Sequence, residues 1–400
     1  MSTLVGRQAA RAAAPSTSLA WIAPSAVAAV SSIVLVQQSR LGDYVVDAGP
    51  ALQALVAGHV GRAIAHQPLM GSFAVVARLP FAAAASLAGA GDTGIYRAGV
   101  LACALALAAV GVTLARVADQ RPWALALPFL AILNPAALAA VRSGHPEEAL
   151  AAALLVGAAL CASRSAITAG LLLGLALATK QWAVVGVGPV LWLVPSGRRR
   201  VATCVAGAIA LALTLPLLVS SSAFTATSHQ AATSPTTSGR ATLWFLVAHH
   251  TTLHLNVPAG IPSTVSLATV PSWIARGAHP AIVLLPLVAT ALVWRRKPTT
   301  ADALTLLTLV LLARCVLDPV DNAYYHLPFV VALLALEVVR RRPPVATLAA
   351  CAGLWLTFDR LDATASVSPF VTNGCYLAWT TAIAAYLAHF LWSQSDRART

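Results

Sequence analysis

Charged residues are scarce in this sequence. Only 10% of its 400 residues are charged, and 58% are hydrophobic, which gives a mean hydropathy of +0.78. Soluble globular domains usually carry about 25% charged residues. The composition therefore excludes an ordinary soluble domain and predicts an integral membrane protein.

Segments of alternating hydrophobicity, which mark barrel strands, are lacking too. The apolar residues instead form continuous blocks such as 19–36 and 201–219, each close to the roughly 20 residues that a helix needs to cross the hydrocarbon core. Helices satisfy their own backbone hydrogen bonds in lipid. We predict an all-α, polytopic integral membrane protein with a single membrane domain over residues 1–400 and about 11 to 13 transmembrane helices.

The sequence also lacks the cysteine spacings that are typical of a metal site or a disulfide framework. The six cysteines are scattered singly, mostly within apolar runs, and we expect them to be small core residues. A cleavable signal peptide is not expected, because the first apolar run is longer than a signal core and no clear cleavage site ends it. We expect a retained signal anchor there.

Basic residues outnumber acidic ones by 26 to 13, for a net charge of +13. Nucleic-acid binding is not expected, because the arginines gather in short clusters between apolar runs, at 198–200, 295–297 and 340–342. This is the positive-inside pattern of cytoplasmic loops. It predicts a multi-pass protein of the cytoplasmic (plasma) membrane with its N-terminus in the cytoplasm.

This orientation places two long loops outside. The first external loop, 38–71, has a moderately amphipathic middle that we expect to form a helix at the membrane interface. The large external loop, 220–279, is rich in Ser, Thr, His and Pro. The segment 73–91 would add one span too many between Asp47 and Glu147. We therefore expect that segment, or its neighbour, to be a partial or interface-bound helix.

Acidic residues gather on the predicted outer side. Solvated loops are the simple explanation for any one of them, but ionisable residues at the ends of spans tend to mark functional cavities. The acidic residues assigned to this side are Asp43, Asp47, Glu147, Glu148, Asp318, Asp321, Asp359 and Asp362.

Asp43 and Asp47 are four residues apart, and a helix would place both carboxylates on one face. One of them could accept a proton from an attacking hydroxyl group, or both could hold a divalent metal ion. A solvated loop turn explains the same spacing. We take both as candidate catalytic residues; the sequence requires no cofactor and leaves metal binding open.

The stretch RSGHPEE, 142–148, joins two apolar runs. Pro146 can start a helix with Glu147 and Glu148 in its first turn, where the helix dipole favours acids. The dipole explains the glutamates but not the adjacent His145. All three side chains are candidate substrate-binding residues.

Two basic residues lie near predicted outer ends of spans. The amine of Lys180 either snorkels to the interface or binds an anion such as phosphate. Arg314 and Asp318 could form an i, i+4 pair, and Tyr325 could belong to an interfacial aromatic belt. An arginine that reaches a lipid phosphate would occupy the same position. We take these four as candidates for substrate binding.

Three stretches together carry a family resemblance. They are the acidic first loop after one span, NPAALAAVRSGHPEEALAAALLVGAAL, and RSAITAGLLLGLALATKQWAVVGVGPVLWLV, with a weaker echo at RCVLDPVDNAYYHLP. In these stretches, over about residues 19 to 200, the chain resembles the GT-C membrane glycosyltransferases that use polyprenyl-phosphate sugars. The protein O-mannosyltransferase-like and actinobacterial mannosyltransferase-like branches are the nearest.

The resemblance implies an active site on the external face. Asp43 or Asp47 would be the catalytic base or bind the acceptor, Glu147 or Glu148 would take the second acidic position, and Lys180 would lie near the donor phosphate. The first loop lacks the adjacent acidic pair of some branches, and the second site reads His-Pro-Glu-Glu. These departures leave the branch, the sugar and metal dependence open.

We therefore expect a glycosyltransferase that moves a sugar, mannose by preference, from a polyprenyl-phosphate donor to a cell-envelope glycan, glycolipid or protein acceptor. Its expected partners are the donor, the acceptor and membrane lipid, without nucleic acid. Three alternatives remain, one of which is a purely structural subunit. A lipid-linked polysaccharide ligase or polymerase would depend on Arg and His of the large loop. A transporter or lipid flippase would carry ionisable residues near the middle of its spans.

Overall fold

The computed structural model describes residues 19–66, 71–119, 121–219, 237–238, 240–254, 264–364 and 366–397, and these are mostly helical. The first half contains α1 (Leu19–Gln37), η2 (Gly42–Val45), α2 (Gly49–Val56), α3 (Val60–Ala65), α4 (Ser72–Val76), α5 (Leu79–Leu87), α6 (Asp92–Ala118), α7 (Ala126–Ile132), α8 (Pro135–Ser143), α9 (Glu147–Cys161), α10 (Ala166–Thr179), η3 (Gln181–Gly186) and α11 (Val187–Leu193). The second half contains η4 (Ser196–Arg198), α12 (Arg199–Val219), β1 (Thr237–Ser238), η5 (Leu243–Val247), β2 (His249–His254), β3 (Thr264–Thr269), α14 (Ser272–Val293), α15 (Thr300–Leu317), η6 (Ala323–His326), α16 (Leu327–Val339), α17 (Val345–Leu354), η7 (Trp355–Leu361) and α18 (Pro369–Arg397).

Five helical segments among the described residues are long and apolar enough to cross a membrane. They are Asp92–Ala118, Ala126–Ser143, Ser272–Val293, Thr300–Leu317 and Pro369–Leu391. Several have large apolar side chains on the surface; Leu284, Leu287 and Leu292 of α14 are examples. An exposed apolar helix face has a favourable environment in lipid and an unfavourable one in water.

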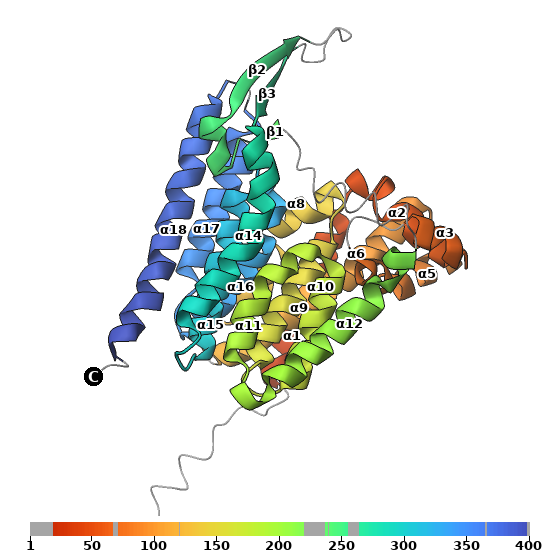
Figure 1. Cartoon of the computed structure of the whole chain (residues 1–400). Coiled ribbons are helices and arrows are strands. Elements are labelled where there is room, and N and C mark those ends of the chain that lie inside the picture. Colours follow the sequence, from red (N-terminus) through yellow and green to blue (C-terminus); the bar gives the residue numbers. More distant parts are fainter. Residues whose placement is uncertain are drawn as a thin grey trace, which may run out of the picture.

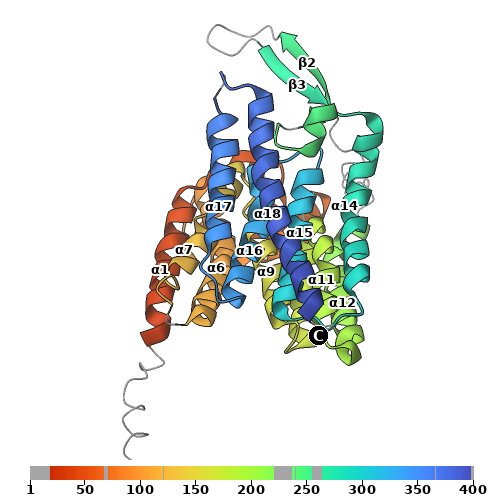
Figure 2. The same ribbon diagram turned by 90° about the vertical axis from the view of Figure 1, so that its left-hand side faces the viewer.

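The core lies where α9 and α16 meet. α9 packs against α6, α10 and α16, and α16 is buried on every side from Leu327 to Val338. A helix that is apolar all round is expected at the centre of a bundle. Figures 1 and 2 show α14, α15, α17 and α18 running beside this centre, with α1 and α6 on its other side.

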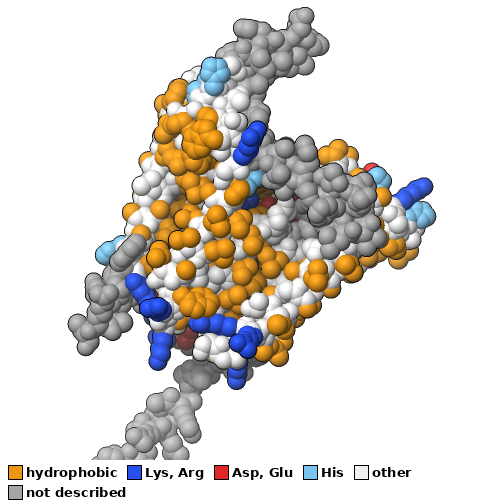
Figure 3. Space-filling view, viewed as in Figure 1, with side chains coloured by type: hydrophobic (Ala, Val, Ile, Leu, Met, Phe, Trp, Pro, Cys, Tyr) orange, Lys and Arg blue, Asp and Glu red, His pale blue; other side chains and the backbone are white. Residues whose placement is uncertain are grey.

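The basic clusters lie at one end of the bundle. They occupy the junctions of α11 with α12, α14 with α15, and α16 with α17, which lie at the lower end in Figures 1 and 2. Figure 3 shows Lys and Arg side chains gathered at this end, below a largely apolar surface. The loop between α8 and α9 lies toward the opposite end in Figure 1.

The described residues between 38 and 91, namely 38–66 and 71–91, form short helices rather than a long one. The predicted first external loop contains η2, α2 and α3, of 4, 8 and 6 residues. The segment 73–91 is divided into α4 and α5, of 5 and 9 residues. Pro80 stands in the first turn of α5. A proline has no backbone N–H and cannot donate a helical hydrogen bond to the carbonyl four residues back, which accounts for the break between α4 and α5.

The large loop departs from the all-helical prediction. Residues 220–236, 239 and 255–263 of this predicted loop lie outside the described residues. The described part contains a small antiparallel sheet in the order β1-β3-β2, with His249 opposite Thr269 and His254 opposite Thr264. Runs rich in Thr and Val, such as TVSLAT, fit strands, but the overall polarity of 220–279 pointed to a loop. The loop also ends earlier than predicted, because α14 begins at Ser272. In Figure 2 the β2-β3 hairpin projects beyond the helices.

Candidate functional site

Two glycines bring the first loop against the start of α9. Gly42 and Gly144 both have positive φ, +46° and +91°, which disfavours other residue types. A Cβ on Gly42 would meet the carbonyl oxygen of Ser143, and a Cβ on Gly144 would lie 2.5 Å from the carbonyl oxygen of Leu41. This close approach of two backbones places Asp43 beside His145.

Local sequence signals explain the helix ends that carry the site. The side chain of Asn134 accepts a hydrogen bond from the Ala137 amide and caps α8, with Pro135 in the first turn. Gly144 ends α8 in the left-handed conformation. After Pro146, α9 starts with Glu147 and Glu148 in its first turn, as the sequence predicted.

His145 lies between carboxylates from two parts of the chain. Its Nε2 is 3.1 Å from Asp43 Oδ2, and its Nδ1 is 3.1 Å from Glu147 Oε1 and 4.0 Å from Asp47 Oδ2. The ring of Tyr324 stacks against it, with 4.8 Å between centroids. Burial acts to lower the pKa of His145, but the hydrogen bond and the charge of Glu147 raise it, and the net pKa is above the ordinary histidine value.

The two aspartates differ in their access to solvent. The Asp43 side chain is 67% exposed and that of Asp47 is 14% exposed. They also face different ring nitrogens of His145, so the imidazole stands between their closest oxygens. Asp43 is therefore the carboxylate that an incoming substrate reaches most easily.

Lys180 is held by both glutamates. Its Nζ lies 3.1 Å from Glu147 Oε1 and 3.3 Å from Glu148 Oε1, and the glutamate side chains are 0% and 1% exposed. Burial acts to lower the pKa of Lys180, but the two carboxylates raise it, and the net pKa is raised, so the ammonium stays charged. The resemblance implies that Lys180 lies near the donor phosphate, and that role stays a prediction. In the structure its ammonium is the counter-ion of the two buried glutamates.

Arg78 is a member of the site that sequence reasoning missed. Its side chain is fully buried, and Nη1 lies 3.7 Å from Glu147 Oε2. The guanidinium also lies 5.2 Å from the ring centroid of Tyr44. The signal was an arginine inside the apolar run 73–91. We considered that run only as a possible membrane span. A buried arginine needs a counter-ion, and here the partner is Glu147.

An aromatic bridge links this centre to Arg314. The indole N–H of Trp182 donates to Glu148 Oε2 at 2.8 Å. Arg314 lies 5.4 Å from the Trp182 ring and 4.6 Å from the Tyr325 ring, and its Nη1 donates to the Tyr325 carbonyl oxygen at 3.0 Å. Trp182, which was not among the predicted residues, thus connects the predicted residues Arg314 and Tyr325 to Glu148.

Asp318 belongs to a different set of contacts. Its Oδ1 accepts from the Val320 amide at 3.1 Å and lies 3.7 Å from His279 Nε2. Its carbonyl oxygen accepts a hydrogen bond from Thr242 at 2.7 Å. These contacts join the end of α15 to the large loop and to α14. Asp318 therefore has a role in holding this loop rather than in the contacts of His145.

The site has one accessible acid supported by a buried network of charges. Asp43 contacts His145, which contacts Glu147, which pairs with Lys180 and Arg78. In Figure 3, charged side chains of both signs and a histidine gather in a recess on this face of the molecule. This series of contacts fixes the orientation of His145 and suits proton transfer at Asp43.

Comparisons with known proteins identify no family for this chain. No protein-family model, no curated protein and no solved structure matches the chain.

Proposed function

We propose that this chain is a multi-pass membrane protein that transfers a sugar from a polyprenyl-phosphate donor to a hydroxyl group on the outer face of the plasma membrane. The observation that carries the proposal is the Asp43–His145–Glu147 chain of contacts at the end of an apolar bundle opposite its basic clusters. The positive-inside rule assigns the basic end to the cytoplasm, which leaves the N-terminus inside and the site outside.

A sugar on a polyprenyl phosphate suits a site at this level. The lipid tail stays in the hydrocarbon core, the phosphate lies at headgroup depth, and the anomeric carbon is presented just above it. The apolar helix faces of the chain would contact the tail. A site at the ends of helices can therefore reach the reacting carbon without a nucleotide-binding domain.

The proposed reaction is a displacement at the anomeric carbon. The acceptor hydroxyl oxygen attacks that carbon and forms the new glycosidic bond, while its proton passes to Asp43. The bond from the anomeric carbon to the phosphate oxygen breaks, and its electron pair leaves with the polyprenyl phosphate. His145 orients the Asp43 carboxylate through the 3.1 Å contact.

Arg314 is the cation that we assign to the departing phosphate. One of its N–H groups donates to the Tyr325 carbonyl, and the remaining N–H groups of a guanidinium can bind phosphate oxygens bidentately. Lys180 Nζ already contacts Glu147 and Glu148, and its positive charge is balanced by these two buried carboxylates. We therefore assign Lys180, with Arg78, to neutralising the buried glutamates that hold His145.

The test is sugar transfer by membranes that contain the full chain, supplied in turn with radiolabelled polyprenyl-phosphate mannose, glucose and arabinose. Membranes from cells with the empty vector are the control. We expect label from one donor, with mannose favoured, in a new glycan, glycolipid or glycoprotein. If the folded protein transferred no label from any donor in the presence of native acceptors, the proposal would be wrong. A ligase, polymerase or transporter would then be the better hypothesis.

A further inference from the structure

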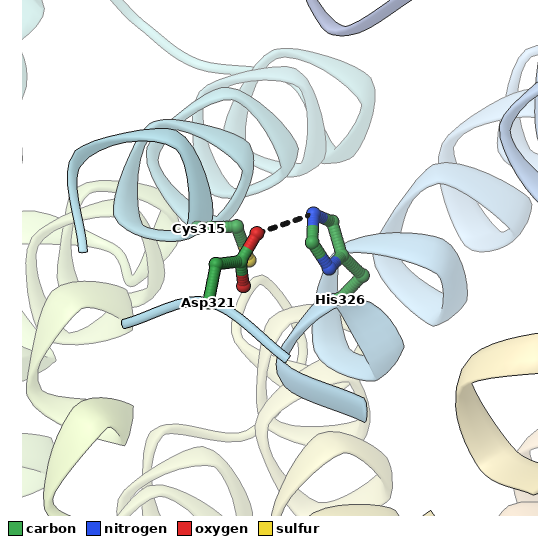
Figure 4. Close-up of side chains that lie close together, drawn as sticks. All are labelled: Cys315, Asp321 and His326. Carbon is green, nitrogen blue, oxygen red and sulfur yellow. Dashed lines mark ion pairs between the residues drawn. The ribbon is translucent and has the colours of Figure 1, made fainter. Parts of the chain in front are cut away.

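A second group of reactive side chains lies behind Arg314 and Tyr325. Cys315 comes from the last turn of α15, Asp321 from the connection that follows, and His326 from the end of η6 (Figure 4). One potential ligand atom from each residue lies within 4.8 Å of the others, and all three residues are buried. The side chains of Asp321 and His326 are 0% exposed.

The arrangement of His326 resembles that of a metal-ligating histidine. Its Nδ1 lies 3.4 Å from the carbonyl oxygen of Asn322, and its Nε2 lies 3.4 Å from Asp321 Oδ2. A backbone carbonyl on one ring nitrogen fixes the tautomer and leaves the other nitrogen as the ligand, which is the usual second-shell device at metal sites. The nitrogen left here is the one that faces Asp321 in Figure 4.

Asp321 has an oxygen that forms no well-aligned hydrogen bond with the residues that the structure describes. Its Oδ2 accepts a hydrogen bond from the Tyr376 hydroxyl at 2.8 Å. Its Oδ1 is buried and accepts no hydrogen bond of ordinary geometry from the residues that the structure describes. A buried carboxylate oxygen without a hydrogen-bond partner costs free energy. Because this oxygen lies near a cysteine and a histidine, we expect a bound ligand to satisfy it.

We propose that Cys315, Asp321 and His326 bind a zinc ion. Thiolate, imidazole and carboxylate are the three ligand types of zinc sites in proteins, and a thiolate disfavours the hard ions magnesium and calcium. One thiolate and one carboxylate neutralise a divalent cation, so the complex adds no net charge to the apolar interior. The hydroxyl of Tyr376, which also lies 3.1 Å from His326 Nε2, stands beside the remaining coordination position.

Zinc binding requires a small contraction of the group. Zinc–sulfur and zinc–nitrogen distances of about 2.3 and 2.0 Å put tetrahedral ligand atoms roughly 3.5 Å apart. The irregular backbone between α15 and η6 can supply this movement without disturbing either helix. Cys315 loses its thiol proton to solvent on binding.

The ion would be structural and would hold part of the candidate site. The Tyr325 carbonyl oxygen accepts from Arg314 Nη1 at 3.0 Å and from the Cys315 thiol at 3.2 Å, so the two groups of residues share one backbone atom. Zinc would tie the end of α15 to the start of α16 and thereby fix the position of Arg314. This inference does not depend on sugar transfer.

The first test is the zinc content of the full-length protein purified in detergent, supplied with zinc and then dialysed against metal-free buffer. We expect stoichiometric zinc in the wild type and in the matched control Cys103→Ala, and loss of zinc in Cys315→Ala. Cys103 is also a buried cysteine, but it lies in α6, outside the group. Zinc in Cys315→Ala at the wild-type level would overturn the proposal.

Cobalt substitution supplies a readout that does not require a stable variant. Cobalt bound by a thiolate gives a sulfur-to-metal charge-transfer absorption band, and we expect this band in the wild type. Zinc should also raise the thermal unfolding temperature of the wild type, because it binds the folded state. A wild-type protein that takes up no zinc, or a cobalt form without the band, would contradict the assigned ligands.

Discussion

Replacing Lys180 by methionine removes the counter-ion of two buried carboxylates. The Lys180 side chain is 14% exposed and those of Glu147 and Glu148 are 0% and 1% exposed, so water cannot take the place of the ammonium. Breaking a buried ion pair by removing one partner costs about 3 to 5 kcal/mol. Arg78 remains 3.7 Å from Glu147, so we expect the lower end, about 3 kcal/mol.

The assay is thermal unfolding in detergent, followed by tryptophan fluorescence. A loss of this size corresponds to a decrease in Tm on the order of 5 °C. Lys297→Met is the matched control, because Lys297 is exposed and a surface change of this kind costs within about 0.5 kcal/mol. The second variant is Lys180→Met with Glu148→Gln, which removes one of the stranded charges and should be more stable than Lys180→Met alone.

Two results would refute the reasoning. One is a Lys180→Met protein as stable as Lys297→Met. The other is a double variant that is no more stable than Lys180→Met, because the charge of Glu148 would then not be the source of the loss. Either would mean that the ammonium is not the counter-ion that the contacts indicate.

Three further predictions concern the parts that hold the site. Gly144→Ala should lower stability by about 1 to 3 kcal/mol, because Gly144 has a positive φ and lies against the Leu41 carbonyl. Gly207→Ala should not lower stability, because a Cβ at Gly207 would meet open space. Thermal unfolding of the two variants tests this difference. Trp182→Phe should lower the free energy of unfolding by about 1.5 to 3 kcal/mol, because the hydrogen bond to the Glu148 carboxylate is lost. Trp192→Phe should lower it by about 1 kcal/mol, because the Trp192 indole donates to the neutral carbonyl of Arg296. Equal losses of stability would contradict a charged Glu148. Because the pKa of His145 is raised in the folded state, protonation stabilises the fold fully at pH values below the ordinary histidine pKa of about 6.5, and this stabilisation is lost as pH rises through the folded-state pKa. The difference in Tm between the wild type and His145→Gln should therefore shrink with rising pH. A difference in Tm that stays constant with pH would contradict this prediction.

Sequence reasoning found most of the polar residues that meet in the site. Asp43, His145 and Glu147 were selected because ionisable residues at the ends of apolar runs need a reason to be there. The structure brings these three into contact. The caps at Asn134 and Gly144 are local signals that the sequence contains but that were not used to place α8.

The roles within the site depend on long-range packing and could not be predicted. The phosphate role of Lys180 stays a prediction, and only the fold shows that both glutamates contact its ammonium. Arg78 and Trp182 lie in apolar runs far from Glu147 and Glu148 in sequence, so their pairing requires knowledge of which helices are neighbours. The small sheet was missed because its residues are polar enough to resemble a loop.

The catalytic assignment of Asp43 is tested most directly by sugar transfer from polyprenyl-phosphate mannose by the wild type, Asp43→Asn and Asp119→Asn. Asp119→Asn is the matched control, because Asp119 is exposed at the end of α6 and is not one of the residues of the candidate site. We expect Asp43→Asn to lose activity by roughly 10²-fold or more, the contribution of a general base, with Asp119→Asn equal to the wild type. Transfer by Asp43→Asn at the wild-type rate would contradict the account.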